Sequence, residues 1–541
     1  MRKLYPFSVH FIRFLALIFT GLLFLAGFLF TCYADDMTTQ KVLTRPDNPL
    51  LHLLGMGLFA VILFAVCRMT KRHGAKLKTP LLVLTMGWIL AAGGLLVLFG
   101  RTAPAADAWS VYAAAKSLAA GDTSVIHPTE SYLSYYPQQI GLLAFFEPLI
   151  RLFNLLPVDL EAYHFIKCVY VLLTCVIVWF QYRTVHLLWK NDSADCIYLI
   201  LAGTNLPFIM YSSFVYGEIP SFAALSAGLY YFLRMLSDES SRESALFGGN
   251  RKNILLSLIF FTLSVMLRKN SLVLIIAIVL VSALEGLFRQ KKALLLYAVV
   301  CVLLSVSILP CVQKVYEFRA GNTLRTGVPA MSYFAMGMQE SSRGNGWYNG
   351  YNFNTYQEND MDTASAVQAS RDYIAERSAY FRAHPDYAAS FYFYKFLSQW
   401  ADGTYASRQA TLATLGERHP LLQELYDGRY SPFYIGFCNI YQSMLYLGCF
   451  LCFLQQLLRI EQRSLCFYLG MIGVFGGFLF HMIWEANARY IFLYSLLLIP
   501  YAAAGLSALC GWFSSTFFPA ETRRNKSDRT QDASQTPPTV Q

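Results

Sequence analysis

Residues 101–153 read RTAPAADAWSVYAAAKSLAAGDTSVIHPTESYLSYYPQQIGLLAFFEPLIRLF, and they begin where a long apolar run ends. The stretch opens with one acidic residue, Asp107, and continues with small and aromatic residues that suit a helix lying on a membrane surface. The run before it is apolar enough to span a bilayer. This pattern predicts a carboxylate held at the boundary between lipid and water.

The composition of the whole chain indicates a polytopic membrane protein. Of its 541 residues, 56% are hydrophobic and 14% are charged, which is more apolar surface than one soluble core can bury. The net charge of +10 comes from short basic blocks beside apolar runs, where they set membrane topology, so we expect no nucleic-acid partner. The 12 cysteines give neither a metal-ligand spacing nor a disulfide framework, and one bridge among Cys32, Cys311 and Cys438 stays open.

The apolar runs predict an all-α fold with about twelve membrane-spanning helices, each of roughly 20 residues. The expected spans are Phe11–Thr31, Leu50–Cys67, Pro80–Gly100, His164–Tyr182, Ala194–Ser213, Glu218–Leu236, Ile254–Leu267, Ser271–Phe288, Ala293–Pro310, Pro432–Leu457, Leu465–Ile483 and Ala488–Phe513. Basic blocks before the first span and between the second and third belong in the cytoplasm. This rule places both termini in the cytoplasm and Asp107 outside.

Two regions are expected to stay out of the bilayer. The segment Ile140–Phe153 has Glu147 and Pro148 in its middle, and a crossing there would turn every later basic block outward, so we interpret it as a re-entrant or surface helix. Residues 311–431 are too polar to span and predict one extracytoplasmic domain, mixed or mostly helical, between late helices.

The expected division of the chain follows from these segments. It is 1–79 for two N-terminal helices, 80–310 for a transmembrane core with its first outer loop at 101–161, 311–431 for the extracytoplasmic domain, 432–513 for the C-terminal helices and 514–541 for a disordered cytoplasmic tail.

Asp107 is the first candidate for chemistry. Low-dielectric lipid nearby raises the pKa of a carboxylate toward the range that suits a general base, which takes a proton from a hydroxyl group. The other interpretation is that Asp107 caps the helix that follows it. The two roles are compatible.

Charged residues at other predicted outer helix ends form a second set. Arg268 and Lys269, in SVMLRKNSLVL, are predicted to lie on the outer side, where the positive-inside rule disfavours basic residues. They either bind a lipid-linked phosphate at headgroup depth or extend to the headgroups of ordinary lipid. Glu485 and Arg489, in HMIWEANARYIFLY, share one helical face, either as a local ion pair or with Arg489 on a phosphate and Glu485 positioning it. Glu218, in VYGEIPS, is either a helix-start carboxylate favoured by the dipole or a wall of the site.

Tyrosines and glutamines complete the candidates. The motif SYYPQQIG supplies Tyr135, Tyr136, Gln138 and Gln139 at the external end of an embedded segment. Interfacial tyrosines commonly form an aromatic belt, but buried glutamine amides need partners, and sugar hydroxyls would suit them. Three aromatic residues of the outer domain either stack on sugar rings or pack in its core; they are Trp347, Tyr348 and Trp400.

The order of four short motifs resembles one family of membrane enzymes. The motifs are ADAWSVYAAAKSLAAGD in the early outer loop, SYYPQQIGLLAFF before an embedded helix, LRKN in a later external turn and EANARYIF before the last helix. Together they resemble GT-C superfamily glycosyltransferases, in particular the bacterial relatives of protein O-mannosyltransferase and of lipid A aminoarabinose transferase.

The resemblance implies an enzyme of the bacterial plasma membrane. Such an enzyme moves a sugar from a polyprenyl-phosphate carrier to an envelope glycan, glycolipid or protein on the outer face, with inversion at the anomeric carbon. By position, Asp107 matches the catalytic acidic residue, and Arg268 or Lys269 and Arg489 match basic positions near the lipid phosphate. Many relatives have a second acid where this chain has Ala108, which counts against a paired-carboxylate or bridging-metal role. We expect no cofactor, and the sequence gives no support for a divalent metal.

Two other functions stay open at this point. About twelve helices with both ends inside is also a common layout for a transporter or a lipid-linked glycan flippase. Carriers place ionisable residues near the bilayer midplane, whereas the candidates here lie at helix ends. An oligosaccharide ligase or polymerase would use related chemistry on a whole glycan, and only the length of the product would distinguish it.

Overall fold

The computed structural model describes residues 4–34, 39–129, 131–157, 161–237, 250–288, 290–459 and 463–518. Within these ranges the chain is mostly helical and has one sheet, of two strands. By length and apolar composition, nine helical stretches of the described chain qualify as membrane spans, and one of them, Pro49–Gly100, contains two helices. The expected class, an all-α multi-pass membrane protein, is confirmed at this level.

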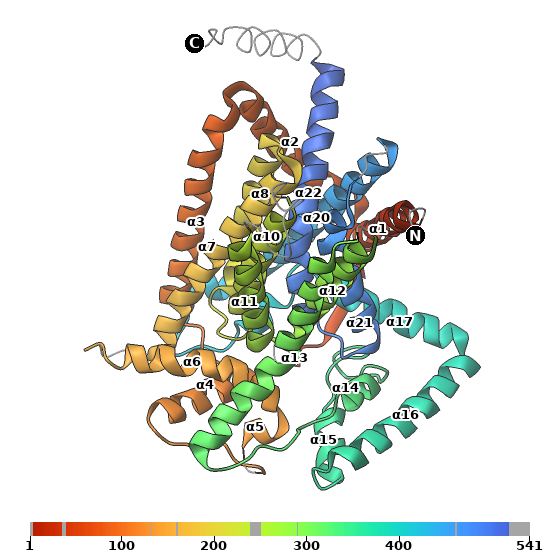
Figure 1. Ribbon diagram of the computed structural model, residues 1–541. Helices are drawn as coiled ribbons and strands as arrows, with labels where there is room; N and C mark the ends of the chain where they lie inside the picture. Colours follow the sequence, from red (N-terminus) through yellow and green to blue (C-terminus); the bar gives the residue numbers. More distant parts are fainter. Residues whose placement is uncertain are drawn as a thin grey trace.

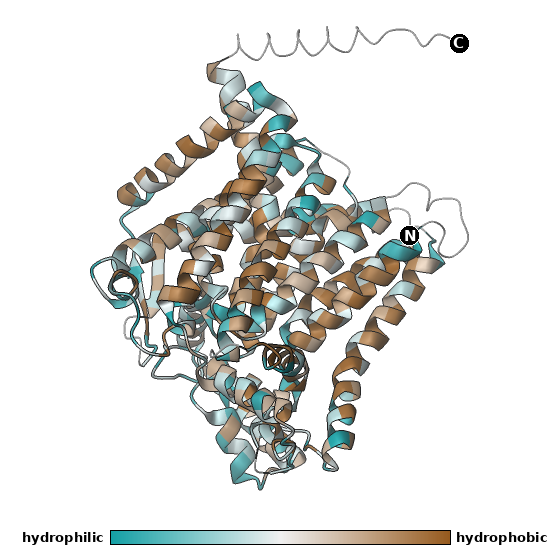
Figure 2. Ribbon diagram, turned by 90° about the vertical axis from the view of Figure 1, so that its left-hand side faces the viewer, coloured by the Kyte–Doolittle hydropathy of each residue, from teal (hydrophilic) through white to brown (hydrophobic). Residues whose placement is uncertain are grey.

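The long apolar helices gather into one bundle (Figure 1). They are α1 (Leu4–Leu29), α2 (Pro49–His73), α3 (Lys78–Gly100), α7 (Ala162–Trp189), α10 (Glu218–Ser237), α12 (Leu272–Phe288), α13 (Lys292–Ala320), α20 (Ser431–Leu458), α21 (Leu469–Ile483) and α22 (Ala488–Phe517). Figure 2 shows brown, hydrophobic helices through the middle of the molecule and more teal, hydrophilic residues toward its lower end. Residues 514–517 of the expected tail belong to α22, and 519–541 lie outside the described residues.

Two expected spans are not among the nine stretches of the described chain that qualify as membrane spans, because each of their uninterrupted helical stretches is shorter than any of the nine. The span Ala194–Ser213 is divided into α8 (Asp192–Thr204) and α9 (Leu206–Tyr211). The helix breaks at Asn205, whose side chain accepts a hydrogen bond from the Phe208 backbone and so caps α9. α11 (Arg251–Leu267) covers the other short span. The number of twelve crossings therefore stays a prediction.

α13 ends later than its expected span. It passes through Pro310 and continues to Ala320, so residues 311–320 belong to this helix rather than to the outer segment. The rest of that segment folds into α14 (Ala330–Met336), α15 (Tyr351–Glu358), α16 (Thr363–Ala383), α17 (Pro385–Trp400), α18 (Ser407–Ala410) and α19 (Pro420–Asp427). Asp362 begins α16 by accepting a hydrogen bond of 2.7 Å from the Ser365 backbone.

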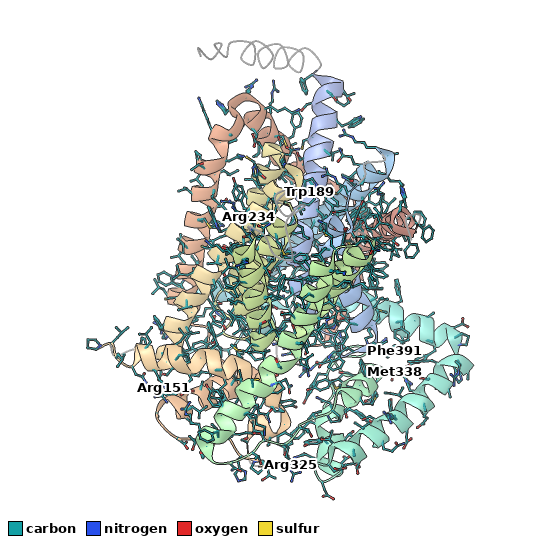
Figure 3. All side chains as sticks on the ribbon, viewed as in Figure 1. Arg151, Trp189, Arg234, Arg325, Met338 and Phe391 are labelled. Carbon is teal, nitrogen blue, oxygen red and sulfur yellow. The ribbon has the colours of Figure 1, made fainter. Side chains whose placement is uncertain are left out.

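The first outer loop and the late polar segment lie at the same end of the molecule. Their helices, α4 (Ala106–Ala119), α5 (Tyr132–Tyr135) and α6 (Ile140–Phe153) on one side and α14–α16 on the other, all lie at the lower end in Figure 1. In Figure 3, Arg151 and Arg325 lie at this end, whereas Trp189 and Arg234 lie in the upper half. The side of a membrane that this end faces stays a prediction.

A small hairpin follows the first span. β1 (Phe30–Ala34) pairs antiparallel with β2 (Val42–Pro46), so the helix ends before Thr31 rather than at it. The hairpin packs on the outer segment, where the Cys32 backbone donates to the Ala401 carbonyl at 2.9 Å. Cys32, Cys311 and Cys438 all carry free thiols, and the bridge left open among them is not formed.

A buried carboxylate joins α6 to the outer end of α13. Glu147 accepts hydrogen bonds from Arg319 at 2.6 Å, Tyr316 at 2.7 Å and Arg151 at 2.9 Å. Burial raises the pKa of Glu147, but these three donors outweigh it and lower the pKa to about 2. The ion pairs therefore stabilise the fold fully above the ordinary pKa of 4.5 and weaken as the pH falls toward 2.

We expect Glu147→Gln to destabilise the protein at pH 7. The loss is roughly 3 kcal/mol, the lower end of the range for breaking a buried ion pair, because Arg151 and Arg319 are partly exposed. Thermal unfolding in detergent measures it. Glu161→Gln is the matched control, since Glu161 pairs with Lys116 at the surface, where the change stays within about 0.5 kcal/mol. Equal melting temperatures for the two variants would contradict the structural role of Glu147.

Candidate active site

An open cleft of about 480 Å³ lies between the first outer loop and the late outer segment. One wall is the start of α4, the second is α5 and the residue after it, and the third comes from the loop before α15 and from α15 itself. Its lining side chains include one charged group and several aromatic rings; they are Asp107, Trp109, Tyr132, Tyr136, Tyr348 and Phe353. The predicted catalytic carboxylate therefore lies in a cleft open to solvent.

Asp107 lies in the first turn of α4 and is not its cap. The N-cap is Ala105, in extended conformation, and it makes no side-chain cap hydrogen bond, so the capping interpretation of Asp107 is wrong. The charge of Asp107 is instead favoured by the positive end of the helix dipole. Ala106 is held at φ +47°, a left-handed conformation that costs an L-residue roughly 1–2 kcal/mol. The strained residue thus stands next to the candidate base.

Tyrosines connect Asp107 with the candidate residues of other segments. Tyr132 lines the cleft with Asp107, and burial and the Asp107 carboxylate help to raise the pKa of Tyr132. Burial and the neighbouring Tyr348, Asp107 and Glu485 raise the pKa of Tyr136, which shows that both carboxyl groups act on this one hydroxyl. The two carboxyl groups therefore lie near a common point at the cleft wall.

Behind the cleft, one carboxylate holds two arginines. The Glu218 carboxylate is 3.0 Å from the Arg268 guanidinium and 3.6 Å from Nε of Arg489. Gly217 permits this approach, because a Cβ at this position would stand 2.7 Å from the Leu267 carbonyl oxygen. Glu218 is 1% exposed, and the side chains of Arg268 and Arg489 are 10% and 20% exposed, so the carboxylate is desolvated and the arginines are mostly buried. Two cations against one anion leave one net positive charge.

The two guanidinium groups retain unused hydrogen-bonding capacity. Nε of Arg268 and Nε of Arg489 are buried and make no hydrogen bond to the described residues. The rings of Tyr216 and Tyr490 lie 5.3–6.0 Å from the guanidinium carbons and form the surroundings of both. Buried donors normally have partners, so these two invite an anionic ligand such as a phosphate oxygen.

Tyr216 lies between the cleft and the arginine pair. Burial and the Asp107 carboxylate raise its pKa, and Arg268 and Arg489 lower it, so the ring lies within range of all three charges. Gln139, one of the predicted amides, donates to the Tyr216 hydroxyl at 2.5 Å. This contact is the role the structure gives to the glutamine.

Glu485 lies in the short loop between α21 and α22 and is 5% exposed. Burial raises its pKa to about 7, and Arg489 opposes the rise. The loop is held from the outer segment by Lys395 of α17, whose ammonium donates to the Trp484 carbonyl at 2.8 Å and to the Gly337 carbonyl at 2.5 Å. The expected helical face shared by Glu485 and Arg489 is not formed, because α22 begins only at Ala488.

Lys269 and Arg268 have different surroundings. Arg268 is the extended residue that follows α11, and Lys269 starts a separate 3-10 turn. Lys269 is exposed, whereas Arg268 is 10% exposed at its side chain and pairs with the buried Glu218. The expectation that both cations serve one phosphate stays a prediction.

The remaining motif residues have separate places. Tyr135 faces α15 rather than the cleft, with its ring 4.9 Å from that of Phe353 and its hydroxyl accepting from Gln357 at 3.3 Å. Gln138 is half-buried and makes no side-chain hydrogen bond within the described chain. Trp347 and Trp400 are buried in the core, as the packing interpretation predicts. Tyr348, by contrast, lines the cleft.

Several residues of the site were not among the sequence candidates. They are Trp109, Tyr132, Tyr216, Phe353, Lys395 and Tyr490. Three stand within two residues of a candidate: Trp109 near Asp107, Tyr216 near Glu218 and Tyr490 beside Arg489. Closeness in sequence to a candidate was therefore the signal that could have identified these three residues. Lys395 and Phe353 carry none, because their place depends on the fold of the outer segment.

One group of described side chains has a geometry that could hold a metal ion. His186, Asp192 and Asp195 bring their ligand atoms within 4.8 Å of one another. The Lys78 ammonium already lies 2.7 Å from Asp192 and 3.4 Å from Asp195, which gives the acidic residues an ordinary counter-charge. None of these residues lines the cleft.

Comparison with known proteins finds no match to any family model and no match to any curated protein. The function must therefore be argued from the geometry of the site.

Proposed function

We propose that this chain is a membrane glycosyltransferase of the GT-C type. It takes a sugar from a polyprenyl-phosphate carrier and transfers it to an acceptor of the cell envelope. The observation that carries the proposal is the placement of Tyr216, whose ring faces both the Asp107 carboxylate of the open cleft and the mostly buried pair Arg268 and Arg489. The base for the acceptor hydroxyl and the cations for the leaving phosphate are thus both neighbours of Tyr216.

The chemistry divides between these two parts. Asp107 removes the proton from the acceptor hydroxyl as its oxygen bonds to the anomeric carbon. The bond between that carbon and the phosphate oxygen breaks, and the carrier phosphate leaves with an additional negative charge. Arg268 and Arg489, preorganised by Glu218, stabilise this charge in the more buried part of the site.

The topology proposed for this enzyme follows from its basic blocks. Twelve crossings of a bacterial plasma membrane place both termini in the cytoplasm and the cleft on the outer face. The acceptor is an envelope glycan, a glycolipid or a protein. Transfer of a whole oligosaccharide uses the same groups and differs only in the length of the product.

The transporter alternative is less well supported. The candidate charges lie at helix ends, whereas carriers place such groups at the bilayer midplane. A cavity between α7, α10 and α22 measures about 20 Å³, which is about the room that one water needs.

The direct test supplies purified protein in vesicles with polyprenyl-phosphate sugars and follows release of the carrier. Mass spectrometry of envelope polymers from cells with and without the protein then identifies the sugar and the acceptor. Transport of a labelled lipid-linked sugar without cleavage of its phosphate bond would contradict the proposal.

A further inference from the structure

Glu485 is a third carboxyl group at the site, and the reaction as proposed gives it no task. It contributes to the electrostatic surroundings of the cleft residues Tyr136 and Tyr348, and Arg489 acts on its own carboxyl group. Its neighbour Tyr490, whose ring lies beside Arg268 and Arg489, favours its ionised form. Glu485 is 5% exposed and lies within electrostatic range of both the candidate base and Arg489 of the candidate phosphate site.

The charges around this place do not balance once an anion binds. Two guanidinium groups, those of Arg268 and Arg489, and three carboxyl groups, those of Glu218, Asp107 and Glu485, lie within electrostatic range of the Tyr216 or the Tyr490 hydroxyl. Among the described residues, Glu218 is the carboxylate in ion-pair contact with both guanidinium groups. A phosphodiester donor brings one further negative charge into a mostly buried site, where like charges repel strongly. Glu218 is ion-paired with both arginines and stays ionised, and Asp107 must be ionised to act as a base. Glu485 is thus the group whose protonation relieves the repulsion.

The other titratable and charged side chains around Glu485 do not change the conclusion that its protonation relieves the repulsion. They are Asp107 of α4, Tyr136 after α5, Tyr333 of α14, Arg343 and Tyr348 of the loop before α15, Lys395 of α17, His481 of α21, and Arg489 and Tyr490 of α22. Burial lowers the pKa of Lys395 to about 7, and Glu485 opposes the shift. The Lys395 ammonium is occupied by two backbone carbonyls, so it is not available to a ligand.

We propose that Glu485 works as a neutral carboxylic acid that donates a hydrogen bond to the donor phosphate, so that donor binding is coupled to uptake of a proton. The inference rests on the proposed function and assigns Glu485 to its phosphate site. During transfer the phosphate becomes a dianion. The hydrogen bond from Glu485 to the phosphate therefore strengthens, because a more negative oxygen is a better hydrogen-bond acceptor. The proton taken from the acceptor hydroxyl still goes to Asp107, and the proton of Glu485 stays shared with the leaving phosphate.

The pH dependence follows from this protonation. The pKa of Glu485 lies near 7 in the free protein, and an adjacent anion raises it further. Binding is therefore strongest below pH 7 and weakens as the pH rises. If the bound anion raises the pKa by about one unit, affinity falls about tenfold between pH 6 and pH 9.

The test measures binding of a short-chain prenyl phosphodiester that carries a methyl group in place of the sugar. This probe cannot be turned over, and its single charge does not change between pH 5 and pH 9. Calorimetry of the full chain in detergent gives the Kd at each pH. Titrations at pH 7.5 in two buffers of different ionisation enthalpy give the number of protons taken up.

We expect Glu485→Gln, a neutral side chain of the same shape, to bind the probe with an affinity that is independent of pH and close to the wild-type value at pH 6. It should take up no proton. Glu485→Leu, which has no hydrogen-bond donor, should bind weakly at every pH. Asp107→Asn should keep the wild-type slope, since Asp107 is not the group that takes up the proton.

A wild-type slope in Glu485→Gln, or loss of the slope in Asp107→Asn, overturns the inference while the phosphate site stands. If wild type and Glu485→Gln take up the same number of protons, the inference is also overturned while the phosphate site stands. If wild-type protein fails to bind the probe at any pH, the proposed phosphate site itself is wrong, and the inference fails with it.

Discussion

Asp107→Asn is expected to lower sugar transfer by about 10²–10⁴-fold, the range contributed by a general base, while the protein reaches the membrane in normal amount. The amide keeps the size of the side chain but cannot accept the acceptor proton. Asp107 lines an open cleft and makes no cap hydrogen bond, so we expect loss of its charge to cost the fold only about 0.3–1 kcal/mol from the helix dipole. Turnover of a polyprenyl-phosphate sugar in vesicles measures the loss.

The matched control for this variant is Asp122→Asn. Asp122 is an exposed acidic residue of the same outer loop, where it accepts a hydrogen bond of 2.9 Å from the Ser124 backbone. It does not line the cleft, and its replacement should leave turnover unchanged. Wild-type turnover by Asp107→Asn would remove Asp107 from the mechanism, and equal losses in the two variants would point to a general effect on the loop.

Arg268→Gln is expected to raise the KM for the lipid donor by about 10–100-fold. This corresponds to the roughly 1.5–3 kcal/mol that a hydrogen bond to a charged group contributes. Glu218 keeps Arg489 as a partner, so the buried carboxylate is not left without a counter-charge. Initial rates at varied donor concentration separate the KM effect from any change in kcat.

Lys269→Gln is the matched control for Arg268→Gln, because it removes the neighbouring positive charge. Lys269 is exposed and stands apart from the buried pair, so its loss should leave the donor KM within about twofold of wild type, as surface changes do. If both variants change KM equally, Arg268 acts only through the general positive charge of the surface. An unchanged KM in Arg268→Gln returns this residue to the snorkelling interpretation.

Much of the helical framework is readable from the sequence. All twelve expected spans fall on helices, and several ends carry recognisable signals, such as the capping residues Asn48, Asn191 and Asp362. Periodicity and capping are local properties, so one sequence reveals them. The β1–β2 hairpin was not foreseen, because its pairing depends on the packing of the outer segment.

The site was predictable in part. The sequence named Asp107, Glu218, Arg268, Glu485 and Arg489, and the structure brings them to one region. Their contacts depend on helix ends that cannot be placed to one residue from a sequence. An extended Arg268 before a 3-10 turn separates two neighbouring cations, and the start of α22 at Ala488 leaves Glu485 outside the helix.

Lys395 illustrates what a sequence cannot reveal. It stands in an aromatic run, and its partners are the backbone carbonyls of Gly337 and Trp484, which lie 58 and 89 positions away. Backbone acceptors carry no residue-type signal. A buried lysine of this kind becomes visible only in three dimensions.

The length of α13 bears on the height above the lipid at which the proposed reaction would take place. Its 29 residues extend about 43 Å along the helix axis, whereas the hydrocarbon layer is about 30 Å thick. The helix is therefore about 13 Å longer than the hydrocarbon layer is thick, and Arg319 near its end binds α6 through Glu147. Under the proposed function, we expect this extra length to place the site at headgroup level, so that a carrier would keep its isoprenoid tail in the bilayer and expose only its head.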